Sequence, residues 1–264
     1  MRTLAVVLAI CLMVSPSLSA DISDESGMVS AVYIDGREAC QPQMVTSIGD
    51  MFYLPLISVA LSAGFRTVDR SENGTVSVSD GERRIIASPN LKYIESNGHY
   101  IWMGETPEVS VDELLIPMES LCLALGVRGE WTGRALIMRS EGSTASDGYD
   151  ERLLLWLSRV IWAEARGECL EGRIAVGQVV LNRMASPYYP DDVVDVLFQS
   201  YQFSTVSNGS IWNDPDESCI LAAKLALDGA DIVGSECLFF NSCPGKTRGL
   251  SYITTIGGHK FYGI

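Results

Sequence analysis

Residues 151–184 read ERLLLWLSRVIWAEARGECLEGRIAVGQVVLNRM and contain the strongest helical pattern in the C-terminal part of the chain. Its first half repeats apolar side chains at helical spacing, which predicts a helix with one buried face. These side chains belong to Leu153, Trp156, Leu157 and Val160. Its second half, 172–184, is apolar on nearly all sides, and such a helix lies at the centre of a domain. The stretch therefore predicts two packed helices, with the second one central.

Glu164 takes the next position on the apolar stripe of the first helix, on the side that faces the core. The residues on either side of it are mostly apolar. An apolar environment disfavours the charged form of a carboxyl group, and a general acid needs this condition to keep its proton near neutral pH. Alternatively, Glu164 lies at the helix end and pairs with Arg159 or Arg166. The pattern makes Glu164 the candidate acid.

Downstream, Asp214 and Gly229 are expected to begin and end a third helix, with Glu217 at the capping-box position. Short strand-like runs separated by glycines follow, at 238–240, 252–256 and 260–262. Helices around a buried helix, with a small sheet beside them, predict a lysozyme-like α+β domain. The glutamate at the end of its first helix is then expected to face the cleft.

Several motifs occur in a fixed order through the same part of the chain, and their order is more specific than any one of them. They are AEARGE at 163–168, EG at 171–172, AVGQVVLNR at 175–183, YQFS at 201–204 and TIGGHKFY at 255–262. With them, residues 153–264 resemble the SleB-type cell wall hydrolase family, which includes spore cortex-lytic enzymes. The resemblance implies a lytic transglycosylase that cuts between N-acetylmuramic acid and N-acetylglucosamine of peptidoglycan. One departure is Ser242-Cys243, where the family often has proline after the asparagine.

In the mechanism that the resemblance implies, Glu164 protonates the leaving oxygen and, as a carboxylate, then removes the proton of the muramyl C6 hydroxyl. A second carboxylate is not required, unlike in two-carboxylate glycoside hydrolysis. Glu168 is the nearby candidate for one, but it is more readily explained by hydrogen bonds to backbone amides or to Arg173. The expected substrate-binding residues are Asn182, Gln202, Phe203, Ser204, Phe240 and His259.

Two of these binding assignments have a structural alternative. Asn182 would otherwise satisfy nearby backbone groups, and His259 would fix a strand turn. Tyr201 and Trp212 are equally consistent with packing. A different enzyme class, a wall peptidase or amidase, would use Cys169 as nucleophile and His259 as base. A third reading is a wall-binding protein whose lysozyme-like module is inactive.

The N-terminal part contains an internal repeat, YLPLISVAL at 53–61 and LIPMESLCL at 115–123, each followed by a turn at glycine. Each copy predicts a strand stopped by proline, a short helix and then a pair of strands. The pattern resembles the copper amine oxidase N-terminal domain. Its signature consists of core and turn positions and carries no metal ligands, so it predicts a β-rich α+β domain that is either a binding module or a spacer.

Domain boundaries follow from composition. Residues 1–20 show the order of a signal peptide, a charge followed by an apolar run and small residues, and the run is too short to cross a membrane. The expected division is a signal peptide at 1–20, a repeat domain at 21–139, a polar linker at 140–150 and a catalytic domain at 151–264. Residues 1–20 therefore predict an exported protein. The resemblance to cell wall hydrolases implies that it acts on the cell wall or spore cortex, with any accessory partner left open.

The whole chain is acidic, with 33 Asp and Glu against 19 Lys and Arg and a formal net charge of −14. Without a basic stripe, it is not expected to bind nucleic acid. No cofactor or metal is expected, because the chain has only His99 and His259 and lacks paired Cys-x-x-Cys motifs. Six cysteines remain after residue 20, and either disulfides or free buried thiols are consistent with them; Cys237 and Cys243 could close a small loop.

Overall fold

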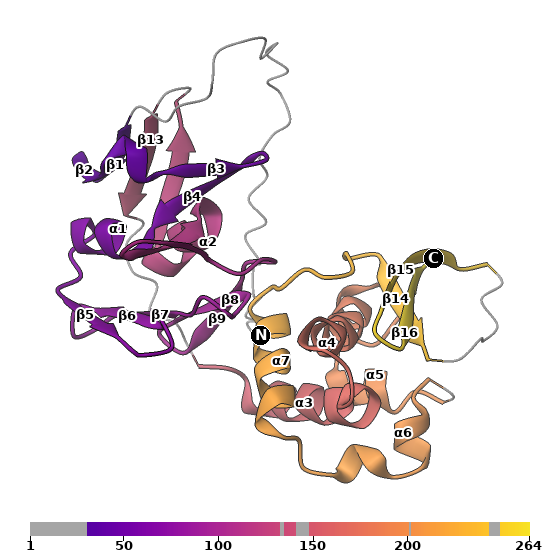
Figure 1. The fold of residues 1–264 in the computed structure, drawn as a ribbon. Helices are drawn as coiled ribbons and strands as arrows, with labels where there is room; N and C mark the ends of the chain where they lie inside the picture. Colours follow the sequence, from indigo (N-terminus) through magenta and orange to yellow (C-terminus); the bar gives the residue numbers. More distant parts are fainter. Residues whose placement is uncertain (1–30, 133–134, 141–147, 201, 243–248) are drawn as a thin grey trace, which may run out of the picture.

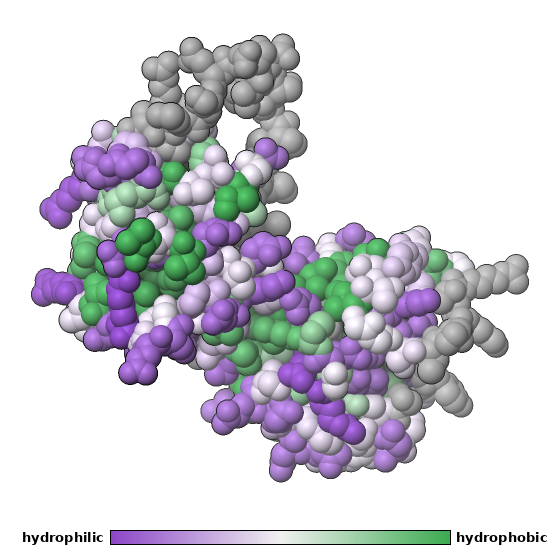
Figure 2. All heavy atoms as spheres, viewed as in Figure 1, coloured by the Kyte–Doolittle hydropathy of each residue, from purple (hydrophilic) through white to green (hydrophobic). Residues whose placement is uncertain are grey.

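The computed structural model describes residues 31–132, 135–140, 148–200, 202–242 and 249–264. The chain forms a β-rich N-terminal module and a helical C-terminal module (Figure 1). The two modules touch over part of their surfaces (Figure 2). The predicted signal peptide and most of the predicted linker lie outside the described residues, as does Cys243.

The N-terminal module has three antiparallel or mixed sheets and two short helices. The first sheet has the order β12-β13-β1-β2, the second β10-β11-β4-β3 and the third β5-β6-β7-β8-β9. Their strands are β1 (Ala31–Ile34), β2 (Arg37–Cys40), β3 (Thr46–Ile48), β4 (Met51–Pro55), β5 (Thr67–Arg70), β6 (Val76–Ser79), β7 (Arg84–Ala87), β8 (Tyr93–Ser96), β9 (His99–Trp102), β10 (Glu108–Ser110), β11 (Glu113–Pro117), β12 (Val127–Trp131) and β13 (Ala135–Ser140). A short 3-10 helix, η1 (Pro42–Met44), precedes β3.

The internal repeat is confirmed. Strand β4 runs into helix α1 (Leu56–Ser62), and strand β11 runs into helix α2 (Met118–Leu125), with a proline as the N-cap residue of each helix. The two strands pair antiparallel, with Leu115 opposite Pro55 and Pro117 opposite Tyr53. Each copy continues into the expected strand pair, β5 with β6 and β12 with β13. The repeats therefore share one sheet and one hydrophobic core.

The C-terminal module consists of helices around α4, with a small sheet on one side. Its helices are α3 (Glu151–Ala165), α4 (Leu170–Ala185), α5 (Val193–Leu197), α6 (Ser204–Ser207), η2 (Ser210–Trp212) and α7 (Glu217–Leu227). Its sheet has the order β14-β16-β15 and is formed by β14 (Cys237–Asn241), β15 (Ser251–Ile256) and β16 (His259–Gly263). This arrangement agrees with the predicted α+β class.

Helix α4 is central, as predicted, and every residue from Ile174 to Val180 is buried. It packs against both α3 and α7. Gly177 allows the close approach of the three helices, because a Cβ there would lie 3.0 Å from Ile161 Cδ1 of α3 and 3.3 Å from Ala226 Cβ of α7. A larger residue at this position would push the helices apart, since the core is close-packed.

The predicted start of the third helix was wrong. Helix α7 begins at Glu217, and its N-cap residue is Asp216, whose side chain accepts a hydrogen bond from the backbone N–H of Cys219. Asp214 lies outside the helix and is almost fully exposed. The end of the helix is as expected: Gly229 has φ +90°, a left-handed conformation that suits glycine.

The two modules are joined by polar contacts at the end of α7. The carboxylate of Asp228 accepts hydrogen bonds from the backbone N–H of Tyr100 and from the Tyr149 hydroxyl, and it lies 2.7 Å from His99 Nδ1. An ion pair between Lys92 and Glu171, 3.1 Å apart, adds a second link. Side chains of the third sheet also pack against the core of the C-terminal module; they are Tyr93, Tyr100 and Trp102.

Within the described residues, no helix is long and apolar enough to cross a membrane. The five cysteines in this part of the chain are free: Cys40, Cys122, Cys169, Cys219 and Cys237. Four of them are buried in the two cores, and burial raises the pKa of the Cys122 thiol to about 12. The small loop proposed between Cys237 and Cys243 lies partly outside the described residues.

Candidate active site

Glu164 lies in the last turn of α3, half-buried, and its carboxyl group is held by one hydrogen bond. The Thr205 hydroxyl donates to Glu164 Oε1 at 2.7 Å. Thr205 belongs to the short helix α6 and is only 5% exposed, so its side chain is fixed by packing. The bond orients the carboxyl group, which a proton-transfer residue requires.

The alternative that Glu164 pairs with a neighbouring arginine was wrong. The guanidinium group of Arg166 lies over the Trp162 ring, 4.4 Å from its centroid. Arg159 lies over Trp156 and approaches Asp214 instead. In the part of the chain that the structure describes, Glu164 has no cationic partner. Neither of these arginines therefore holds the Glu164 carboxyl group in an ion pair.

Glu168 follows the end of α3 and supports the turn between β15 and β16. Its Oε2 accepts a hydrogen bond from the backbone N–H of Gly258 at 2.9 Å, so the expected bond to a backbone amide is present. Arg173, the other suggested partner, donates to the Ser218 hydroxyl and to the carbonyl of Arg166. The geometry gives Glu168 a structural role at this turn.

His259 begins β16 directly after this turn and is 4% exposed. Its Nδ1 lies 3.7 Å from Glu168 Oε1, too far for a hydrogen bond. Its ring packs edge-on against Phe240, with centroids 5.3 Å apart. Phe240 in turn lies 6.2 Å from Phe203, measured between ring centroids. The structure thus brings together three of the predicted binding residues, but two of them are largely buried.

Asn182 and Arg183, at the end of α4, hold the loop that leads into β14. The Asn182 side chain donates to the carbonyls of Gly234 and Cys237, at 2.8 and 2.9 Å. The structure therefore favours the alternative for Asn182, in which it satisfies backbone groups. Arg183 is buried, donates from Nε to the carbonyl of Leu238 and lies over the ring of Phe203, and burial lowers its pKa.

The segment 201–204 is described only in part. Gln202 is exposed and Phe203 is 5% exposed, whereas Tyr201 and the side chain of Ser204 lie outside the described residues. The exposed side chain of Gln202 is accessible to a ligand. Its assignment and that of Ser204 stay predictions.

Two features of the site were not predicted. One is Thr205, which directly follows the YQFS motif but carries no signal of its own in a single sequence. The other is an aromatic cluster formed by Trp156, Phe198 and Trp212, with ring centroids 5.4 to 5.9 Å apart. Phe198 is 40% and Trp212 57% exposed. Trp156 lies two turns before Glu164 on α3, and Trp212 ends η2, which follows α6.

Cys169 and His259 are not in contact within the described residues. Cys169 is exposed as the N-cap residue of α4, and His259 is buried between Phe240, Phe261 and Glu168. A nucleophile and its base must approach within hydrogen-bonding distance. The geometry therefore gives no support to the cysteine-based alternative. Also within the described residues, no group of three or more metal-binding side chains is clustered.

Comparison with known proteins matches each module separately. Residues 167–262 match the family described as Cell Wall Hydrolase, and residues 33–138 match the Copper amine oxidase N-terminal domain. The chain is 36% identical over 117 residues to a spore cortex-lytic enzyme of Halalkalibacterium halodurans, and the matched region covers 43% of this chain and 36% of that protein. It is 29% identical over 126 residues to a spore cortex-lytic enzyme of Bacillus cereus, and the matched region covers 47% of this chain and 49% of that protein.

Among solved structures, the chain matches the catalytic domain of the germination-specific lytic transglycosylase SleB from Bacillus anthracis. The match has 30% sequence identity and a TM-score of 0.41, and it covers 45% of this chain and 99% of that domain. The chain spans half or less of the full length of the spore cortex-lytic enzymes it matches.

Proposed function

The C-terminal module belongs to the cell wall hydrolase family, and from this premise we propose that the chain cleaves the glycan strands of peptidoglycan as a lytic transglycosylase, with Glu164 as its acid and base. The observation that carries the proposal is the carboxyl group of Glu164. It lies at the end of α3 without a cationic partner among the described residues, and it is oriented by Thr205.

The reaction needs one carboxyl group in two protonation states. Glu164 first donates its proton to the glycosidic oxygen while the bond between that oxygen and the muramyl C1 breaks. The resulting carboxylate then accepts the proton of the muramyl C6 hydroxyl, whose oxygen bonds to C1 and closes the anhydro ring. The proton that Glu164 gave up is thereby restored. The reaction consumes no water and requires no second carboxylate. Thr205 holds the carboxyl group in place through both steps.

Two further assignments belong to the proposal. The exposed rings of Phe198 and Trp212 pack on Trp156, which lies two turns before Glu164 on α3. They suit the apolar faces of sugar rings and would hold the glycan strand beside the acid. Residues 1–20 would direct export, so that the chain meets its substrate in the cell wall or spore cortex.

The test is mass spectrometry of the fragments that the chain releases from purified peptidoglycan. We expect products ending in anhydromuramic acid from the unsubstituted chain and none from Glu164→Gln, because glutamine cannot donate the proton. Glu168→Gln is the matched control, since glutamine keeps the oxygen that accepts from Gly258; it should release the same products.

Different products would change the proposal. Fragments with a reducing muramic acid end would mean that water is the acceptor, and loss of activity in Glu168→Gln would return Glu168 to a catalytic role. Release by Glu164→Gln at the rate of the unsubstituted chain would refute the role of Glu164. No release from several kinds of wall would favour the inactive wall-binding alternative.

A further inference from the structure

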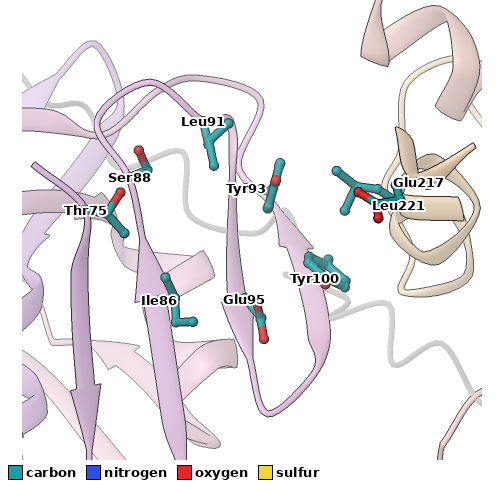
Figure 3. Close-up of a pocket in the computed structure, with 9 residues that line it drawn as sticks. All are labelled: Thr75, Ile86, Ser88, Leu91, Tyr93, Glu95, Tyr100, Glu217 and Leu221. Carbon is teal, nitrogen blue, oxygen red and sulfur yellow. The ribbon is translucent and has the colours of Figure 1, made fainter. Parts of the chain in front are cut away.

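A cavity of about 300 Å³ lies where the two modules meet (Figure 3), and Glu164 is not among the residues that line it. One wall is the outward face of the sheet β5-β6-β7-β8-β9, and the other is the first two turns of α7. Its volume is at the lower end of the range for small-ligand sites, which is roughly 300–1,000 Å³. The lining residues are Thr75, Ile86, Ser88, Leu91, Tyr93, Glu95, Tyr100, Glu217 and Leu221.

The alternation of the strands explains which side chains line this face. One set of side chains points into the N-terminal core; these are Val76, Val78, Ile85, Ala87 and Ile94. Their neighbours along each strand point the other way, toward α7. Ile86, Glu95 and Tyr100 lie directly opposite one another on three adjacent strands and so form a row across that face. The cavity is therefore built on a regular sheet rather than on loops.

The cavity combines flat aromatic rings with hydrogen-bonding groups. Tyr93 and Tyr100 meet edge to face, with ring centroids 5.7 Å apart, and Glu217 and Leu221 of α7 face them from the opposite wall (Figure 3). Burial, with the Glu95 carboxylate acting in the same direction, raises the pKa of both phenols. Their hydroxyls are protonated near neutral pH, as ordinary phenols are, and can donate hydrogen bonds.

The two carboxylates of the cavity are available to a ligand. Neither Glu95 nor Glu217 makes a side-chain hydrogen bond or an ion pair within the described part of the chain. Acceptor oxygens near aromatic rings suit a molecule that has hydroxyl groups around its rim and an apolar face. A neutral pyranose ring has both, whereas two negative charges would repel an anionic ligand.

We propose that this cavity is a second saccharide-binding site, which holds one or two neutral N-acetylhexosamine rings of the glycan strand. The choice of this strand as the source of the sugar rests on the proposed function. The sugar face would pack on Tyr93, and its hydroxyl groups would bond to Glu95, Glu217 and Ser88. Because both modules line the cavity, the N-terminal module would take part in substrate binding and would not be only a spacer.

The test is a titration of the full chain with tetra-N-acetylchitotetraose, followed by NMR of ¹³C-labelled tyrosine rings. The chain carries Glu164→Gln so that a bound sugar is not cleaved, and Tyr93→Phe assigns the Tyr93 signal. We expect saturable shifts of the Tyr93 and Tyr100 signals. Glu95→Gln and Glu217→Gln, one from each wall, should each weaken the affinity about tenfold, the effect of losing one hydrogen bond to a charged group.

Glu130→Gln, on the exposed strand β12 of the same module, is the matched control and should bind like the parent. Tyr93 and Tyr100 signals that do not move, or unchanged affinity in both cavity variants, would overturn the proposal. The proposal would also be overturned if a cationic peptide shifted the Tyr93 and Tyr100 signals and the sugar did not. If the unsubstituted chain releases anhydromuramic products but the tyrosine signals do not shift with the sugar, only the proposed saccharide site is refuted. If the tyrosine signals shift but no products are released, only the proposed function is refuted.

Discussion

Replacement of Gly257 by alanine should destabilise the C-terminal module, because two separate features of the β15–β16 turn require glycine. Gly257 has φ +55°, a left-handed conformation that L-residues rarely adopt. In addition, a Cβ at this position would overlap Glu168 Oε2, the atom that accepts the hydrogen bond from Gly258 N–H. The alanine variant must therefore strain the backbone and displace the Glu168 carboxylate.

The size of the effect follows from these two contributions. A left-handed conformation costs an L-residue roughly 1–2 kcal/mol. The hydrogen bond to the Glu168 carboxylate is worth about 1.5 kcal/mol, the lower end of the range for charged acceptors, because that side chain keeps 20% exposure. Together they predict a loss of about 3 kcal/mol in the free energy of unfolding, a large part of the roughly 5–15 kcal/mol of a typical domain.

Urea unfolding followed by circular dichroism and tryptophan fluorescence measures the loss. Gly229→Ala is the matched control, since Gly229 has φ +90° but a Cβ there would meet no atom within 4 Å, so it should lose only the backbone part, about 1–2 kcal/mol. In a Glu168→Ala background, Gly257→Ala should also cost no more than Gly229→Ala. Equal losses for Gly257→Ala and Gly229→Ala in the unsubstituted chain would refute the assignment of Glu168 as the anchor of this turn.

Two more predictions concern the same module. Asp216→Ala should cost about 1 kcal/mol at neutral pH through loss of the α7 N-cap. Hydrogen bonds from the Ser218 hydroxyl and from the Cys219 N–H lower the pKa of Asp216. The stability that Asp216 contributes is therefore present above its ordinary pKa and is lost as the pH falls below about 4. The free energies of unfolding of Asp216→Ala and of the unsubstituted chain should converge in acid, and a difference that stays constant with pH would contradict the assignment. Trp212→Ala should raise KM for soluble glycan fragments about tenfold and leave kcat within twofold, because the ring would bind substrate without touching the scissile bond; steady-state kinetics would refute this if kcat alone fell.

The sequence predicted what depends on short-range periodicity. The spacing of apolar residues predicted helices α3 and α4 and the central position of α4. The short strands were predicted in the same way, from patterns of a few neighbouring residues. The start of α7 was misplaced by two residues because both Asp214 and Asp216 are suitable caps, and only the backbone geometry selects one.

The candidate site was predictable only in part, for a related reason. Glu164 was identified from its helical position and from the motif around it. Its partner Thr205 lies 41 residues away, and no spacing rule connects the two. Asn182 was expected to bind substrate, with bonding to backbone groups as the alternative. Its partners are backbone carbonyls more than 50 residues further along the chain, and no spacing rule identifies them. The domain boundaries and the binding roles of Gln202, Ser204 and His259 stay predictions.

The parallel pairing of β1 with β13 has a consequence for how the N-terminal module is made. Ala31 pairs with Ala135 and Ile34 with Met138, so the first strand of the module is completed by its last. Strands β4 and β11, which lie between β1 and β13 in the sequence, also pair and so join the two repeats across a long stretch of chain. Contacts at such sequence separation form late, since the intervening chain must be ordered first. During synthesis, the module can close only after residue 140 has been made, and a truncated chain would leave the edges of β1 and β4 open to pairing with other molecules.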